Sequence, residues 1–107
     1  MKAADVNLKL IGCCLTIAII AHPVLAADAL NGEKLARQWC EPCHVVAADQ
    51  RDVTGDAAPF ASIAARPGFD AARIAMFLLD PHPKMPDMSL TRNEAGELAD
   101  YIATLAR

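Results

Sequence analysis

The amino-terminal part of the chain contains one long apolar run, at residues 10–20. Two lysines precede this run, and the small-residue sequence Val-Leu-Ala follows it at 24–26. A basic start, an apolar centre and a small-residue end are the three parts of a secretory signal peptide. We therefore predict a signal peptide at residues 1–26, cleaved after Ala26, and one mature domain at residues 27–107.

The same leader allows two other interpretations. An uncleaved membrane anchor stays open, because signals and anchors grade into each other, although the run is shorter than the about 20 residues that span a bilayer. A lipoprotein is suggested by the sequence Leu-Ile-Gly-Cys at 10–13, but here the apolar run follows this box instead of preceding it. We therefore interpret Cys13 and Cys14 as apolar filler, and we expect no membrane span once the signal is removed.

Beyond the leader, apolar residues recur at helical spacing in short segments. The first helix is expected at about residues 29–40, with Asp28 or Asn31 as its N-cap. A polar stretch without a sustained period follows at 47–58 and predicts a surface loop. A short helix is expected after it, at 60–65.

Two further helices have clear boundary signals. One should begin at Asp70 as N-cap and end before Pro81, since proline disfavours a helical conformation in the preceding residue. Met76 on this helix is interpreted as core packing. The last helix should begin at Thr91, which fits a capping box with Glu94. No segment alternates with period two for long enough to form a strand, so the predicted fold class is all-α.

The charge balance excludes one class of function. The formal net charge is −3 for 107 residues, and loss of Lys2, Lys9 and Asp5 with the signal makes it −4. Because the chain has no basic run, it lacks the clustered Lys and Arg that bind phosphate, and we expect no nucleic-acid partner. A protein partner with a basic docking patch fits better. A mature chain of about 80 residues also buries a modest core and usually depends on a disulfide, a metal or another covalent link.

The most specific signal in the sequence is Cys40-Glu41-Pro42-Cys43-His44, at the end of the first expected helix. A c-type haem needs two thiols that add across its two vinyl groups and a neighbouring imidazole that reaches the iron from one face. The C-x-x-C-H pattern supplies all three, because positions three and four apart on a helical turn share one side. We therefore predict one haem c, attached covalently at Cys40 and Cys43, with its iron bound by His44.

Three other uses of these residues are weaker. A redox-active C-x-x-C of the thioredoxin type expects a βαβ context, which an all-α chain lacks. A structural disulfide between Cys40 and Cys43 is compatible with an oxidising compartment, but it leaves His44 and the later Met unexplained. A structural zinc site normally needs four Cys or His ligands, and only His82 remains nearby to contribute.

The order of features along the mature chain resembles that of the class I c-type cytochromes, and in particular the small bacterial monohaem proteins. A helix with Gly32, the motif at 40–44, a loop proline, a Met in a proline-rich loop and a final helix with an aromatic residue follow in the family's order. The resemblance implies the cytochrome c fold, in which short helices surround one covalently bound haem. It also implies that the first and last helices cross, with Gly32 and Ala36 close to Leu98 and Tyr101.

The same resemblance assigns a role to Pro59. Its backbone carbonyl should accept a hydrogen bond from the ring N–H of His44, which would orient the imidazole and raise its basicity. Pro59 therefore joins Cys40, Cys43 and His44 among the expected cofactor-binding residues.

A second axial ligand is expected on the iron, and a thioether in that position raises the reduction potential. Met85 is followed by Pro86 and lies nine residues before Glu94, a spacing similar to the Met-Pro ligand loop of short bacterial cytochromes c. We therefore predict Met85 as the second iron ligand. Two alternatives stay open: Met88, and His82, which would give a bis-His haem of lower potential.

With both axial positions filled, the iron has no open site for a substrate, so we expect an electron carrier and not an enzyme. Electrons would pass by outer-sphere transfer to redox donors and acceptors that dock transiently near the exposed haem edge. The signal predicts a periplasmic location, with a monomer as the default. Two alternatives stay open: a dedicated cytochrome subunit of a periplasmic oxidoreductase or respiratory complex, and a haem-based gas sensor or enzyme with an open iron site.

Overall fold

The computed structural model describes residues 24–51, 55, 57–81 and 83–106, and the side chains from residue 29 onward. These residues form four helices: α1 (Val24–Trp39), α2 (Phe60–Ala64), α3 (Ala71–Leu79) and α4 (Arg92–Thr104). No strand occurs in these ranges, and the all-α fold class is confirmed for them. None of the described helices combines the length and the apolarity that crossing a bilayer requires. Most of the predicted signal peptide, Cys13, Cys14 and His82 lie outside the described residues.

Helix α1 begins earlier than expected. The sequence predicted a start at about residue 29, but the helix extends back to Val24, so neither Asp28 nor Asn31 is its N-cap. The residues between are mostly Leu and Ala, which are strong helix formers, and they continue the helix upstream of the expected cap. The predicted cleavage point after Ala26 therefore falls in the first turn of α1.

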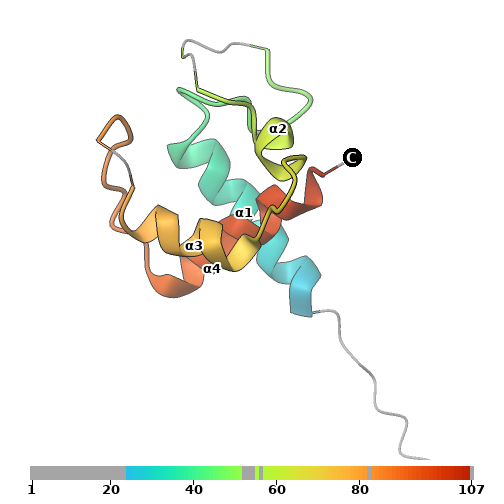
Figure 1. The fold of residues 1–107 in the computed structure, drawn as a ribbon, viewed down its shortest axis with the longest axis vertical. Helices are drawn as coiled ribbons and strands as arrows, with labels where there is room; N and C mark the ends of the chain where they lie inside the picture. Colours follow the sequence, from blue (N-terminus) through green and yellow to red (C-terminus); the bar gives the residue numbers. More distant parts are fainter. Residues whose placement is uncertain (1–23, 52–54, 56, 82, 107) are drawn as a thin grey trace, which may run out of the picture.

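Helices α1 and α4 cross closely, as the resemblance implied (Figure 1). At the crossing, a Cβ atom added to Gly32 would lie 2.6 Å from the carbonyl carbon of Glu97 and 2.8 Å from the Cβ of Tyr101. Ala36, one turn later, is fully buried in the same cluster as Leu98 and Tyr101. The two helices can approach this closely because the residue at the contact has no side chain.

Two helix starts are confirmed in detail. The side chain of Asp70 accepts hydrogen bonds from the N–H groups of Ala72 and Arg73, at 2.9 and 3.2 Å, as an N-cap does. At α4, Thr91 Oγ1 accepts from the N–H of Glu94 at 3.1 Å, and the Glu94 carboxylate accepts from the N–H of Thr91 at 2.8 Å. This capping box lowers the pKa of Glu94, because the N–H and hydroxyl of Thr91 favour the ionised carboxylate.

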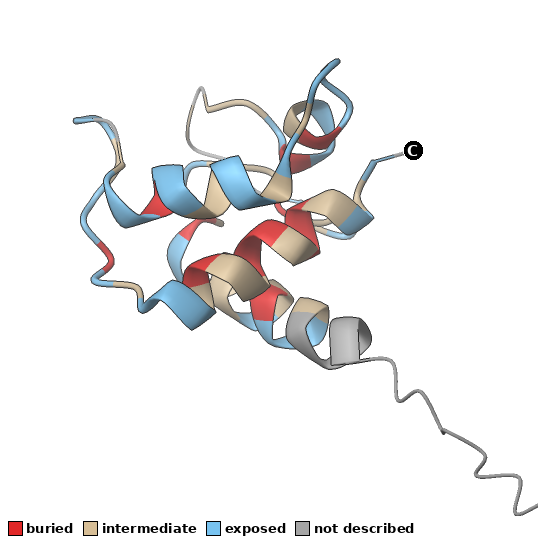
Figure 2. Ribbon diagram, turned by 60° about the horizontal axis from the view of Figure 1, so that its bottom comes forward, coloured by how far each residue is buried: buried red, intermediate tan, exposed pale blue. Residues whose placement is uncertain are grey.

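The hydrophobic core lies between α4 and the other three helices (Figure 2). Its buried members come from every helix and from both long connections: Ala36, Cys40, Val46, Phe60, Ala64, Leu78, Met88, Ala95, Leu98, Ala99, Tyr101 and Ile102. The prediction that Met76 packs in the core is wrong, since its side chain is 75% exposed. Leu78 is buried and Ile74 packs against the core. Met76 is two positions from each, so it points to the opposite side of the helix.

Candidate functional site

The C-x-x-C-H motif forms a turn that continues directly from α1. The N–H of Cys40 donates to the carbonyl of Ala36 at 2.8 Å, and the N–H of His44 donates to the carbonyl of Cys40 at 2.8 Å. The N–H of Cys43 donates to the same Cys40 carbonyl at 3.1 Å. These bonds have helical spacing, so one turn brings both thiols and the imidazole together, as the sequence predicted.

The two thiols differ in environment. Cys40 is buried in the core and Cys43 is exposed, and both are free rather than joined in a disulfide. Burial raises the pKa of the Cys40 thiol to about 11, with a smaller contribution from the nearby Cys43. Burial therefore disfavours the thiolate form of Cys40 in the folded chain.

The His44 ring is held by two contacts from the segment that leads into α2. Its Nδ1 lies 2.6 Å from the carbonyl oxygen of Ala58, so this nitrogen is the donor. The ring of Phe60 packs against the imidazole, with 5.2 Å between centroids. With Nδ1 protonated and bonded, Nε2 is the nitrogen with a free lone pair for a metal.

The expectation that the carbonyl of Pro59 accepts the His44 hydrogen bond is wrong. Pro59 is the N-cap of α2, and its carbonyl accepts from the N–H groups of Ser62 and Ile63, at 3.0 and 3.1 Å. A carbonyl in this position points along the helix and is committed to the first turn. The carbonyl of Ala58, one residue earlier, lies outside the helix and takes the role expected of Pro59 at His44.

The motif turn borders a cavity of about 750 Å³. The cavity lies between that turn, the loop before α2, helices α2 and α3, and the loop before α4, with single lining residues from the end of α1 and from α4. Met85 and Met88 both line it together with His44. Met85 is half-buried and packs at the border of the core, whereas Met88 is a buried core residue. Apolar walls come from Phe60, Ile63, Ile74, Phe77, Leu78 and Ile102.

Comparison with known proteins finds a clear relative. Cytochrome c-552 of Bradyrhizobium diazoefficiens is 50% identical over 101 residues, which cover 92% of this chain and 97% of the relative. The chain belongs to the class I c-type cytochromes. As such it is a monohaem electron carrier with covalently bound haem c, and it has redox partners. No protein-family model and no solved structure matches the chain.

The residues of this cytochrome that surround the cavity fit haem c. A cavity of about 750 Å³ is in the size range of cofactor sites, and its mainly apolar walls suit the porphyrin ring. The turn of the motif offers two thiols and one imidazole, and the loop before α4 offers two thioethers. The charged side chains that line it within the described ranges are Arg66 and Lys84, whose positive charges suit the two haem propionates.

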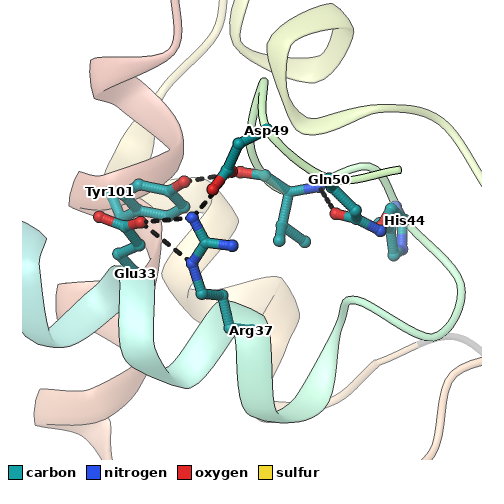
Figure 3. Close-up of polar contacts among 7 residues, drawn as sticks. Glu33, Arg37, His44, Asp49, Gln50 and Tyr101 are labelled. Atoms are coloured by element: carbon teal, nitrogen blue, oxygen red, sulfur yellow. Dashed lines mark hydrogen bonds and ion pairs between the residues drawn. The ribbon is translucent and has the colours of Figure 1, made fainter. Parts of the chain in front are cut away.

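Sequence reasoning missed one residue of the cytochrome site, Gln50. Its Nε2 donates to the carbonyls of His44 and Glu41, at 2.9 and 3.1 Å. Its Oε1 accepts from the N–H of Val46 at 2.8 Å (Figure 3). One amide thus bonds the backbone on both sides of the motif histidine. Gln50 lies in the segment interpreted as a surface loop, and a single polar residue in a loop carries no signal in the sequence that marks such a role.

Further side chains fix the same loop to the helices of the cytochrome. Arg37 of α1 bonds both Glu33 and Asp49, at 2.9 and 3.0 Å, which lowers the pKa of Asp49 (Figure 3). Tyr101 of α4 donates its hydroxyl to the carbonyl of Val46 at 2.6 Å, and burial raises the pKa of this tyrosine. The loop that follows the motif is therefore tied to both crossing helices.

A glycine further along the same loop lies directly against the motif. A Cβ atom added to Gly55 would lie 2.8 Å from both the Cα and the carbonyl oxygen of Cys43. Real side chains do not tolerate such distances, so only glycine lets this loop pass so close to Cys43.

Proposed function

We propose that haem c is attached through thioethers at Cys40 and Cys43, and that His44 Nε2 and the Met85 sulfur bind its iron. The hydrogen bond from His44 Nδ1 to the carbonyl of Ala58 carries this proposal, because it leaves Nε2 as the metal-binding nitrogen. A hydrogen-bonded imidazole is also the more basic ligand.

Met85 is the better thioether ligand for this site. Met88 is 8% exposed, and we interpret its side chain as a gap-filler beside the cavity. Met85 also lines the cavity, but it is less buried than Met88 and precedes Pro86. A proline next to the ligand restricts the loop, which lowers the entropy lost when the sulfur is fixed.

The chain then acts as a one-electron shuttle and not as an enzyme. With both axial positions filled, haem c supplies a ferric/ferrous couple, and the protein sets its potential and presents one haem edge. Donors and acceptors dock transiently at that edge as the monomeric carrier diffuses between them. The signal peptide at 1–26 directs export to the periplasm, and the net charge of −4 that remains after its removal favours partners with basic docking surfaces.

The test is the visible spectrum of the protein produced in a host that matures c-type haem. Oxidised and reduced spectra are recorded before and after addition of CO, for the wild type and for two matched variants, Met85→Ala and Met88→Ala. We expect a low-spin haem that does not respond to CO, with a weak Met-to-ferric-iron band that is lost in Met85→Ala and kept in Met88→Ala. A high-spin wild-type haem that binds CO at once would mean an open iron site and a sensor or an enzyme.

A further inference from the structure

The amide of Gln50 occupies an unusual place next to the motif. The turn at 40–44 continues α1 and then stops, and the last carbonyls of a helical segment have no partner within the helix. The carbonyls of Glu41 and His44 are two of these, and Gln50 Nε2 donates to both. Gln50 Oε1 accepts from the N–H of Val46, just beyond His44. The assignment of N and O in this amide follows from its partners, since two are acceptors and one is a donor.

His44 is thereby fixed at two ends by different parts of the chain. Its ring is held by Ala58 and Phe60. Its backbone is held by Gln50, through its own carbonyl and the N–H of Val46. A side chain that is anchored at both its backbone and its ring has little freedom to tilt.

Gln50 itself is well anchored. The adjacent Asp49 is paired with Arg37 on α1. The carbonyl of Val46 receives the hydroxyl of Tyr101, so the segment 46–50 is bonded to both crossing helices (Figure 3). The position of the amide is therefore set by the fold and not by the local loop alone.

We propose that Gln50 is a positioning residue for the axial histidine, and that its amide sets the orientation of His44 on the haem iron and with it the reduction potential. The inference rests on the proposed ligation by His44. Groups that hold a metal ligand in place tune the metal, and the hydrogen bonding around an axial ligand is one of the means by which a protein sets a haem potential. A ligand held in the same place in both oxidation states also suits rapid electron exchange.

The alternative is that Gln50 only stabilises the loop. In that case its loss would lower the free energy of unfolding and leave the native haem unchanged. A positioning role instead changes the native haem itself, in its potential and in the spectra that report how the imidazole is oriented.

The experiment compares Gln50→Glu and Gln50→Leu with Gln38→Glu in the haem-loaded protein at pH 7. The Gln50→Glu carboxylate can still accept from Val46 but cannot donate to the carbonyls of Glu41 and His44, and Gln50→Leu removes all three bonds without adding charge. Gln38 is exposed on α1, so Gln38→Glu repeats the chemical change and the added charge away from the loop. Reduction potential, electron paramagnetic resonance of the ferric haem and urea unfolding are measured for each.

We expect both Gln50 variants to shift the potential and the resonance g-values, with Gln38→Glu close to the wild type. If both Gln50 variants are less stable but keep the wild-type potential and g-values, Gln50 only stabilises the loop and the proposal is wrong. If neither variant accumulates with haem, Gln50→Asn, whose shorter amide reaches fewer partners, gives the same comparison. A wild type without the His/Met signature would instead overturn the ligation, and this outcome is visible before any Gln50 variant is made.

Discussion

The crossing of α1 and α4 allows a quantitative test with one substitution in two places. Gly32 and Gly96 both lie inside helices, at the crossing and on the open side of α4 respectively. An added Cβ atom at Gly32 meets the Glu97 backbone and Tyr101, whereas at Gly96 it meets nothing within 4 Å. The two Gly→Ala changes therefore share the same gain in helix propensity and differ in packing alone.

The expected magnitudes follow from these contacts. At Gly32 the nearest atoms are the carbonyl oxygen and carbon of Glu97 and the Cβ of Tyr101, and these cannot turn away as a flexible side chain would. To restore ordinary van der Waals distances around the added Cβ, the two helices must move apart. Overpacking of this kind lowers the free energy of unfolding by about 1–3 kcal/mol. In each variant, the higher helix propensity of alanine raises the free energy of unfolding by about 1 kcal/mol. We expect Gly96→Ala to stabilise the fold by about 0.5–1 kcal/mol, and Gly32→Ala to be less stable than Gly96→Ala by about 1–3 kcal/mol.

The assay is reversible unfolding of the haem-loaded protein, followed by circular dichroism and by haem absorbance. In a domain of this size, 1 kcal/mol corresponds to about 4–8 °C in Tm, so the difference between the variants is well resolved. Equal shifts of Tm in the same direction for both variants would show that α1 and α4 do not meet at Gly32, and the crossing described here would be wrong.

Three further outcomes are expected. Tyr101→Phe leaves the Val46 carbonyl without its buried partner and should lower the unfolding free energy by about 1–2 kcal/mol in urea titrations; an unchanged midpoint would contradict the bond. The capping box bonds the ionised form of Glu94, so the pKa of this carboxyl is lower in the folded than in the unfolded state. Its contribution to stability is therefore complete above the ordinary carboxyl range, and it is lost as the pH falls through the lowered pKa. Glu94→Gln keeps an acceptor for the capping box and should reduce the dependence of unfolding free energy on pH in acid; an unchanged slope would refute this assignment. Gly55→Ala should push its loop away from Cys43 and lower the yield of covalently bound haem, measured as haem retained on denaturing gels, and a wild-type yield would contradict the close approach.

Local features of the chain were well predicted from its sequence. Asp70 and the Thr91 and Glu94 pair are caps whose partners lie within three residues, so no knowledge of the tertiary fold is needed. The motif turn is local in the same sense, since its spacing alone places Cys43 and His44 within one turn of Cys40.

Features that depend on the path of distant segments were not predicted correctly. The acceptor for His44 is Ala58 and not Pro59, because the start of α2 decides which carbonyl is free to face the imidazole. Met76 is apolar and has apolar neighbours, but the placement of α3 on the core turns it to solvent. Gln50 reaches the motif only because its loop folds back over it, and the hydrophobic periodicity of the sequence does not predict this path.

The bond between Tyr101 and Val46 joins residues 55 positions apart, and the α1 and α4 crossing likewise joins the first and last described helices. A chain that leaves the ribosome amino end first therefore presents Cys40 before α4 is available to complete the core around it. Once α4 is in place, Cys40 is 5% exposed and a poor nucleophile. We therefore expect haem to attach to Cys40 more readily in an open chain than after α4 has packed against α1.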